Sequence, residues 1–401
     1  MTKGAFIYSS ERREWALMAK ILCAMSGGVD SSVAAYLLKR EGHDVTGVFL
    51  RLGPDAVSQI HDARSHAGPQ RPAEATNRGA AGTIPQNRAC CSVEDSRDAA
   101  LVAARLDIPY YSLDYEGEFK PIIDNFIDEY NRGRTPIPCV LCNQWLKFGS
   151  LREKARALGC DYVATGHYAR VDKHPSGAWQ LRRGVDRDKD QSYFLFLMPK
   201  ASLPQTLFPV GGYTKNEIRS IAREADLPVA EKPESQEICF VPGDDYREVL
   251  RAKTPERLRP GNFIDLSGHV LGQHEGHQNF TIGQRRGTGI ALGTPHYVVA
   301  LDTEANTVTL GERDALHGRG ARLSGVQWTS LAHDPEDGEQ RRLDVQIRHR
   351  HSAQSALVEA RNGGGATVTF DEPQTAITPG QAAVFYDGDV IVGGGWIDTA
   401  E

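Results

Sequence analysis

Between residues 20 and 240, short apolar runs alternate with stretches whose apolar positions recur every three or four residues. The short runs predict strands at 21–25, 45–50, 110–113 and 162–165. The periodic stretches predict helices at 31–40, 96–106, 118–131 and 147–158. Strands that alternate with helices build a parallel sheet covered on both faces. We therefore expect an α/β domain over residues 20–240.

The pattern changes at two places. Residues 53–88 are rich in Pro, Gly, Ala, Asn and His without periodicity, which predicts a surface insertion that carries no chemistry. After residue 242, short alternating runs are separated by turns such as Asp387-Gly388, a pattern typical of small antiparallel barrels. We expect a small β-rich central domain over 241–312 and a C-terminal β-barrel over 313–401.

Composition limits the possible functions. The chain has 401 residues, and its net charge of −6 argues against indiscriminate coating of nucleic acid. No run approaches the roughly 18 apolar residues of a membrane span, and the start lacks a secretory signal, so we expect a cytoplasmic protein without a membrane partner. In that compartment the 7 cysteines predict reactive or ligating thiols rather than a disulfide framework.

The strongest chemical signal is the segment Ser26-Gly27-Gly28-Val29-Asp30-Ser31-Ser32, which we call the phosphate loop. It lies between a predicted strand and a predicted helix. Its glycines allow close backbone approach, and a helix start offers unpaired N–H groups to an anion. It is neither a Walker A loop nor a dinucleotide fingerprint. Because the loop itself has no lysine to reach a γ-phosphate, it suits the pyrophosphate released when ATP adenylates a substrate.

Cysteines supply the second signal. Cys139 and Cys142 form a Cys-x-x-Cys pair after two prolines, and Cys142 is predicted to lie where a helix begins, a setting that lowers a thiol pKa. Such a pair serves zinc binding or redox chemistry. A zinc site needs two further ligands, and with no second Cys-x-x-Cys or His pair nearby, Cys90-Cys91 would have to complete it from a distance. Cys239 follows a polar Ser-Gln-Glu stretch, which favours a loop over a buried, inert thiol.

Seven segments, taken in order, resemble the bacterial tRNA-specific 2-thiouridylases: SGGVDSS, TPxPxxxCN with KF, ATGHYAR, KDQSYFL, EICF, TIGQRRGTGI and TPGQAAVFY. The resemblance covers residues 20–397. It implies an ATP-pyrophosphatase-type N-terminal domain that, with the central domain and the barrel, grips a tRNA and replaces the 2-oxygen of its wobble uridine with sulfur. ATP would activate that oxygen by adenylation, with Mg²⁺ as counter-ion and no resident metal site.

The resemblance also implies roles for single residues. Cys239 would carry a persulfide received from a sulfur-donor protein, and Cys142 would attack it, leaving a Cys142–Cys239 disulfide. Asp30 would orient the phosphate loop or a magnesium-bound water. The expected nucleotide contacts are Ala24, Met25, Ser26, Gly27, Gly28, Val29, Asp30, Ser31, Ser32, Leu50 and Gly166. The expected tRNA contacts are Ile137, Pro138, Cys139, His167, Lys189, Asp190, Gln191, Arg348, His349 and Gln381.

The chain departs from the family pattern before the nucleophile. Many members have Asn and Asp where this chain has Ile137 and Cys139, so contacts to the target base through those side chains do not carry over. Cys139 also allows an alternative in which it binds an iron–sulfur cluster together with Cys142 and Cys239. Two further interpretations are an amide ligase for a small metabolite and a non-catalytic RNA-binding module. The first leaves the cysteines without a role, and the second leaves the phosphate loop without one.

Overall fold

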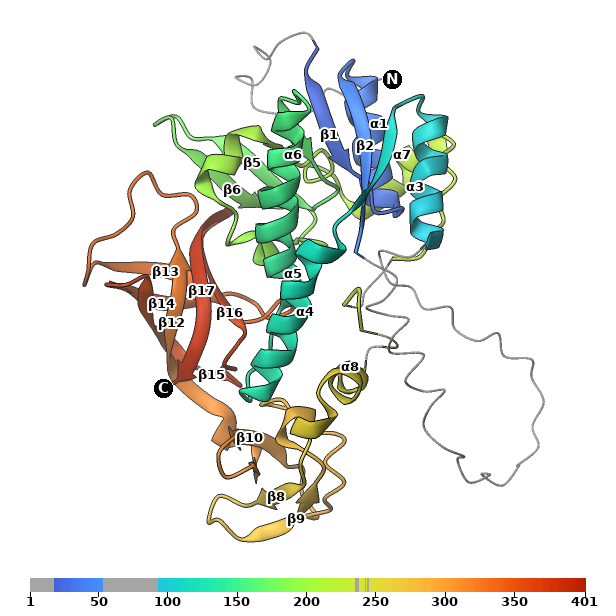
Figure 1. The fold of residues 1–401 in the computed structure, drawn as a ribbon. Coiled ribbons are helices and arrows are strands. Elements are labelled where there is room, and N and C mark those ends of the chain that lie inside the picture. The colour runs from blue at the N-terminus through green and yellow to red at the C-terminus, as the bar shows by residue number, and fades with distance from the viewer. Residues whose placement is uncertain (1–17, 53–92, 235–237, 242, 244) are drawn as a thin grey trace, which may run out of the picture.

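The computed structural model describes residues 18–52, 93–234, 238–241, 243 and 245–401. The expected insertion 53–88 and Cys90-Cys91 lie outside these residues. Figure 1 shows an α/β region at the top, a small β-rich region at the bottom and a barrel at one side, with the long helix α4 (Glu116–Asn131) running between them.

Five parallel strands form the N-terminal sheet, in the order β3-β2-β1-β4-β7. Their bounds are β1 Lys20–Ala24, β2 Asp44–Arg51, β3 Tyr110–Asp114, β4 Tyr162–Ala164 and β7 Thr206–Leu207. The remaining helices of this region are α1 Val29–Arg40, α3 Val93–Arg105, α5 Pro138–Leu141, the π-helix η2 Cys142–Ser150, α6 Leu151–Ala157, the 3₁₀ helices η3 Ser192–Leu195 and η4 Lys200–Gln205, and α7 Lys215–Glu224. The predicted parallel α/β architecture is confirmed.

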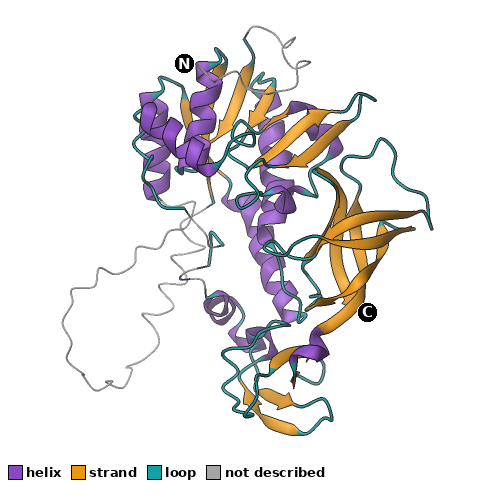
Figure 2. Cartoon of the chain, turned by 180° about the vertical axis from the view of Figure 1, so that it is seen from behind, coloured by secondary structure: helices purple, strands orange, loops and turns teal. Residues whose placement is uncertain are grey.

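Side-chain alternation in β1 explains why helices cover both faces of this sheet (Figure 2). Ile21 and Cys23 point to one face, where they share a core with residues of α1, α3 and α7. Leu22 points to the other face and packs with Leu151 and Ala155 of α6. Successive side chains of a strand face opposite ways, so one apolar run serves two cores.

The strand order reverses between β1 and β4, which pair with each other and extend the sheet in opposite directions. Ligands of such sheets bind in the crevice at the carboxyl ends of the strands on either side of this switch. The phosphate loop follows β1 there. It leads into α1, whose first turn carries Asp30 and whose last turn carries Lys39 and Arg40, charges that suit the helix dipole.

The prediction that a helix begins at Cys142 was wrong. The helix begins four residues earlier, at Pro138, and α5, η2 and α6 continue without a break to Ala157. Proline suits the first helical position because its missing N–H is not needed there. Cys139 therefore lies in the first turn of this segment, which we call the cysteine helix (residues 138–157), and Cys142 begins its π-helical part.

The central region contains the sheet β10-β11-β8-β9, as expected of a small β-rich domain. Its elements are α8 Tyr246–Lys253, η6 Pro255–Arg257, β8 Gly261–Ile264, β9 Val270–His274, η7 His277–Asn279, β10 Tyr297–Asp302, β11 Thr307–Gly311 and η8 Arg313–Leu316. Among the residues that the structure describes, no helix is long and apolar enough to cross a membrane.

The C-terminal sheet closes into a six-stranded barrel because β12 pairs with both β15 and β17, which confirms the predicted barrel. Its strands are β12 His317–Gln327, β13 Gln340–Gln346, β14 Gln354–Arg361, β15 Gly365–Thr375, β16 Ala382–Asp387 and β17 Val390–Ala400. A hairpin from the N-terminal region, β5 Ala169–Lys173 and β6 Trp179–Arg183, joins this sheet where Arg182 pairs with Val390. The sequence analysis did not predict this hairpin.

Candidate active site

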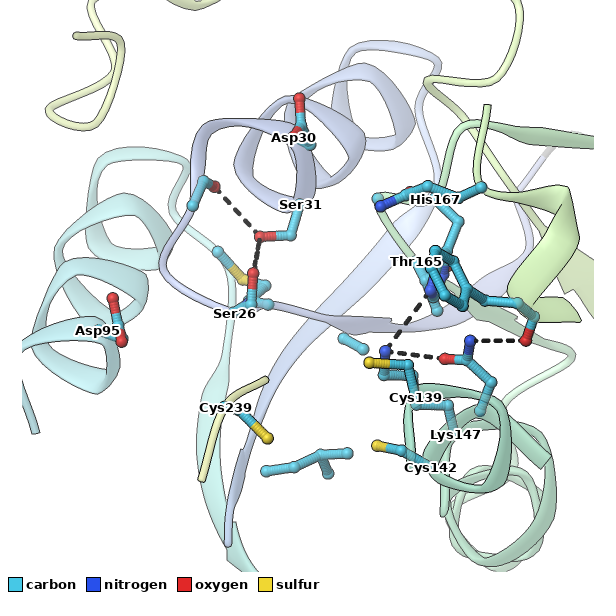
Figure 3. Close-up of a pocket in the computed structure, with 18 of the residues that line it drawn as sticks. Ser26, Asp30, Ser31, Asp95, Cys139, Cys142, Lys147, Thr165, His167 and Cys239 are labelled. Atoms are coloured by element: carbon cyan, nitrogen blue, oxygen red, sulfur yellow. Dashed lines mark hydrogen bonds between the residues drawn. The ribbon is translucent and has the colours of Figure 1, made fainter. Parts of the chain in front are cut away.

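A cavity of about 390 Å³ opens at the carboxyl ends of β1, β2 and β4 (Figure 3). The phosphate loop forms one wall and the cysteine helix forms another. Of the residues predicted from the sequence, the structure brings these to the cavity: Ala24, Met25, Ser26, Gly28, Val29, Asp30, Ser31, Leu50, Pro138, Cys139, Cys142, Gly166, His167, Lys189, Gln191 and Cys239. The lining excludes Gly27, Ser32, Ile137, Asp190, Arg348, His349 and Gln381.

Hydroxyl groups fix the shape of the phosphate loop. The Ser31 Oγ lies 3.2 Å from the Ser26 Oγ and donates to the Gly28 carbonyl at 3.2 Å, while the buried Ser32 Oγ donates to the same carbonyl at 2.8 Å. The Ser26 N–H donates to the Ser31 Oγ at 3.1 Å. The loop therefore holds its conformation through its own side chains, and Ser32 acts inside the loop rather than at the cavity surface.

The three glycines at the site have different functions. Gly27 has a φ of +72°, and a Cβ there would lie 2.2 Å from the Asp95 carbonyl oxygen. At Gly166, after β4, a Cβ would lie 2.5 Å from the Ser31 N atom. At Gly28 the nearest atom to a Cβ is the Ser26 Oγ at 3.6 Å. Gly27 and Gly166 thus allow chain segments to meet, whereas Gly28 leaves space open beside the loop.

Two lysines that the sequence analysis missed reach the loop from distant segments. The buried Lys215, at the start of α7, binds both Asp30 carboxylate oxygens at 2.8 Å. Lys232 donates to the Gly27 carbonyl at 3.0 Å and to Asp95 at 2.7 Å. The loop motif lacks a lysine, but the site does not. Neither lysine lies in a motif, so only the three-dimensional fold identifies it.

A carboxylate and a phenol complete this charged group. Glu234 accepts from Lys189 at 2.7 Å and pairs with Lys215 at 3.0 Å. Burial opposes ionisation of Glu234, but these hydrogen bonds outweigh it and lower its pKa. Tyr168 donates to Asp30 at 2.7 Å, and burial together with the Asp30 charge raises the pKa of its phenol. Asp30 is therefore held between a cation and a neutral donor, which fixes its orientation beside the loop.

Three thiols face the cavity. Figure 3 shows Cys139 and Cys142 on the cysteine helix, and the sulfur atoms of Cys142 and Cys239 point toward one another across the pocket. Cys139 is exposed, whereas Cys142 and Cys239 are half-buried and pack against the same apolar cluster. Ile238 to Phe240 form no strand, which agrees with the loop expected around Cys239.

A polar network lies behind the thiols. The sequence analysis assigned a role to His167 in this network but not to its other members. Lys147 donates to the Asn143 side-chain oxygen at 2.9 Å and lies 3.5 Å from the His167 Nε2. The His167 Nδ1 lies 2.6 Å from the Thr165 hydroxyl. Burial, with the Lys147 charge, holds the pKa of His167 well below its usual value. A neutral imidazole protonated on Nδ1 satisfies both contacts.

The other expected tRNA contacts lie around the pocket. Asp190 does not reach the cavity, because its carboxylate binds Arg183 at 2.9 Å and the Ser192 hydroxyl at 2.8 Å. Arg348 and His349 belong to a barrel loop, and the His349 ring lies 4.5 Å from that of Phe194, which lines the cavity. Through its hydrogen bonds Asp190 therefore stabilises the structure around the pocket, and His349 lies at the edge of the pocket.

The remaining described cysteines lie away from the cavity. Cys23 is fully buried in β1, and burial raises its pKa to about 12. Cys160 is half-buried, and burial raises its pKa as well. Within the parts of the chain that the structure describes, no group of three or more His, Cys, Asp or Glu is arranged to hold a metal ion.

Three family models together match most of the chain. They describe a tRNA methyl transferase HUP domain at residues 19–78 and 75–243, a tRNA methyl transferase PRC-barrel domain at 247–312, and an aminomethyltransferase beta-barrel domain at 319–397. Fold and site thus define a HUP-domain protein with two appended β domains.

Relatives identify the family more closely. A tRNA-specific 2-thiouridylase MnmA from Geotalea uraniireducens is 45% identical, with 95% of each chain covered. Those from Carboxydothermus hydrogenoformans and Moorella thermoacetica are 45% and 46% identical, cover 94% of this chain, and are themselves covered over 97% and 99%. The chain belongs to the tRNA-specific 2-thiouridylase family, as the sequence motifs predicted.

Proposed function

We propose that this protein catalyses ATP-dependent 2-thiolation of the wobble uridine of tRNA, through adenylation of the C2 oxygen followed by sulfur transfer from a cysteine persulfide. The observation that carries the proposal is one cavity that joins the phosphate loop to Cys142 and Cys239. ATP activates the 2-oxygen and sulfur attacks the C2 carbon that bears it, so both groups are needed in one cavity.

The phosphate-loop wall supports adenylation. Gly28 leaves open space beside the start of α1, where N–H groups and the helix dipole favour an anion, and Lys215 and Lys232, each paired with carboxylates, line the same cavity. The uridine 2-oxygen attacks the α-phosphate of ATP and pyrophosphate leaves, which turns a poor leaving group into AMP. Mg²⁺ would neutralise phosphate charge. The nearby Asp30 and Asp95 already bind lysines, so we assign the ion to the nucleotide phosphates and water rather than to a protein cage.

The thiol wall supports sulfur transfer. A donor protein leaves a persulfide on Cys239, and the Cys142 thiolate attacks the Sγ of Cys239. The bond to the terminal sulfur breaks, that sulfur adds to C2 as sulfide, and AMP leaves. The Cys142 and Cys239 thiols supply the two electrons and become a disulfide, which a cellular thiol reductant must reduce before the next turnover.

A second sulfur mechanism also has an observation in its favour. Cys139 lines the same cavity as Cys142 and Cys239, so three thiols surround the space in which an iron–sulfur cluster would bind sulfide directly, although the three are not grouped closely enough in this structure to hold a metal ion. An ultraviolet–visible spectrum of anaerobically purified protein separates the two mechanisms. Sulfur-to-iron charge-transfer bands would favour the cluster, and a spectrum without them would favour the persulfide.

Nucleoside mass spectrometry tests the proposal as a whole. Purified protein with ATP, unmodified tRNA and a persulfide donor should form 2-thiouridine, and cells that lack the protein should lose it. The Gly28→Ala variant should keep its fold and lose ATP–pyrophosphate exchange in the presence of tRNA, because the Cβ projects into the proposed phosphate space. Amide formation on a small metabolite, or tRNA binding without thiolation, would replace the proposal with one of the other two interpretations.

A further inference from the structure

The segment that leads into the cysteine helix is held by the barrel. The Thr135 N–H donates to the Pro379 carbonyl at 2.9 Å, and the Gln381 side-chain amide donates to the Thr135 carbonyl at 3.0 Å. Pro379 and Gln381 lie in the loop between β15 and β16. The backbone N–H and C=O of Thr135 are thus both paired with barrel residues, and Gln381 lies 246 positions further along the chain.

Arg134 adds a second set of contacts to the same segment. Its guanidinium binds Glu129 of α4 at 2.6 Å, Asp398 of β17 at 3.1 Å and the Ile397 carbonyl at 3.2 Å. The Arg134 side chain is 23% exposed and that of Glu129 15%, so this pair is largely shielded from solvent. Three acceptors arranged around one planar cation suit arginine and no other side chain.

Gly380 brings the two backbones into contact. A Cβ at this position would lie 2.8 Å from the Thr135 N atom and 2.9 Å from its carbonyl oxygen, and the φ of Gly380 is +86°. A glycine is therefore required where the barrel loop meets the segment. We call the contacts made by Arg134, Thr135, Gly380 and Gln381 the barrel clamp.

Apolar packing holds the cysteine helix against the barrel as well, because Val140 shares a buried cluster with Ala382 and Val384 of β16, but this packing is incomplete next to the start of the helix. A second cavity, of about 350 Å³, lies next to the start of the cysteine helix and is lined by Pro136, Ile137 and Leu141 on that side and by Trp396 on the barrel side. Protein interiors normally fix an element through close packing. Beside this cavity the polar contacts of the barrel clamp add to that packing in fixing where the first turn of the helix lies.

We propose that Arg134 and Gln381 are positioning residues through which the barrel holds the cysteine helix, and with it Cys142, in register with the active-site cavity. The inference rests on the proposed role of Cys142 in sulfur transfer. It gives the Gln381 amide a partner inside the protein, in place of the tRNA contact that the family resemblance implies. The barrel then contributes to the rate of the reaction itself and not to tRNA binding alone.

Two variants loosen the barrel clamp to different degrees. Gln381→Glu keeps the side-chain shape but removes the N–H donor to Thr135, and Arg134→Ala removes all three guanidinium contacts. Arg134→Lys retains a charge that can pair with one carboxylate and should restore part of the function. The matched control is Arg322→Ala, an exposed arginine of β12 that pairs with Glu401 and does not touch the segment.

The measurements are single-turnover thiolation at saturating tRNA, the tRNA Kd, and the rate at which iodoacetamide alkylates Cys142, followed by peptide mass spectrometry. We expect both loosening variants to lower the saturated rate, by roughly 10- to 100-fold for Arg134→Ala, since small misplacements of reacting atoms carry costs of that order. Alkylation of the half-buried Cys142 should become faster. The tRNA Kd should stay at the wild-type value, and the control should match wild type in all three measurements.

Weaker tRNA binding with an unchanged saturated rate in Gln381→Glu would overturn the inference and return Gln381 to tRNA contact. Unchanged rate and unchanged alkylation would overturn it as well. Circular dichroism reports whether Arg134→Ala folds, and if it does not, Gln381→Glu alone decides. If wild-type protein forms no 2-thiouridine, the proposed function fails, while the alkylation rates still test the barrel clamp.

Discussion

The two walls of the active-site cavity are built in different ways. The phosphate-loop wall is one continuous run, residues 26–32, whose serine hydroxyls bind the backbone of the same run. The thiol wall combines the cysteine helix with residues 238–240 and depends on the barrel loop at 379–381 for its position. A local motif therefore fixes the conformation of the phosphate loop, around which distant lysines are added, whereas the thiol wall exists only in the folded assembly of distant segments.

The largest effect expected is on the thiol wall. Cys142→Ser and Cys239→Ser should each abolish thiolation, because a hydroxyl can neither carry nor attack a persulfide at neutral pH. Cys23→Ser and Cys160→Ser should leave thiolation intact, since neither residue lines the cavity and burial raises the pKa of both thiols. Single-turnover assays with a protein persulfide donor make the comparison.

These variants, together with Cys139→Ser, can contradict the assignment. Normal turnover by Cys239→Ser would remove its carrier role. Loss of activity in Cys139→Ser with retention in Cys239→Ser would transfer that role to the exposed thiol in the first turn of the cysteine helix.

The sequence predicts the two walls to different extents, because one wall contains a continuous motif and the other is assembled from distant segments. The glycines and serines of the phosphate loop are adjacent, so their chemistry can be read from seven residues. The cysteines could be named individually, but the meeting of Cys142 and Cys239 comes from the resemblance to a family and not from spacing. Lys215 and Lys232 lie in no motif and reach the loop only because α7 and the segment after it fold back against α1.

The sequence likewise predicted some elements of the fold and missed others. The pattern of apolar positions predicted the barrel and four of the five strands of the N-terminal sheet, but not β7, because short apolar runs and alternating runs both leave a regular signal when they are long enough. It did not predict the β5–β6 hairpin, whose burial depends on pairing with a strand more than two hundred residues away in sequence. It also misplaced the start of the cysteine helix, because Pro138 reads equally well as a rigid approach and as a first helical residue.

On the phosphate-loop wall, the sharpest test compares two adjacent glycines. Gly27→Ala should lower the free energy of unfolding by about 2 kcal/mol or more, because a Cβ would overlap the Asp95 backbone and the φ is positive. Gly28→Ala should leave stability nearly unchanged, because its Cβ meets only ordinary contact at 3.6 Å, while ATP use is lost. Urea unfolding and pyrophosphate exchange, measured on both variants, separate folding from binding. Equal loss of stability in the two would show that Gly28 is needed for folding as well and would remove its assignment to phosphate binding.

At the barrel edge of the cavity we expect a smaller effect, on tRNA affinity. Arg348→Ala should weaken tRNA binding and lower the slope of log Kd against log salt concentration by about 1, since one phosphate contact is lost. Burial, with the Arg350 charge, lowers the pKa of His349, so this ring is neutral at pH 7 and His349→Ala should leave the salt slope unchanged. Saturating tRNA should restore the rate of Arg348→Ala, because binding made equally in ground and transition states does not alter kcat. A lower saturated rate would place Arg348 with the barrel clamp rather than with the tRNA grip.

The smallest effect concerns Glu234, which connects Lys215 at the phosphate loop with Lys189. Its pKa in the folded protein lies below the unfolded value of about 4.3, so its contribution to stability is present above that pH and is lost as the pH falls through the folded pKa. Because the pair is partly exposed, Glu234→Gln should cost only about 0.2–1 kcal/mol at pH 7. Urea unfolding should show this difference shrinking in acid, while the exposed control Glu256→Gln stays close to wild type throughout. A difference that persisted unchanged below the folded pKa would mean that Glu234 stabilises the site through packing. In that case the lysines at the phosphate loop would be held by the other carboxylates, Asp30, Asp95 and Asp98.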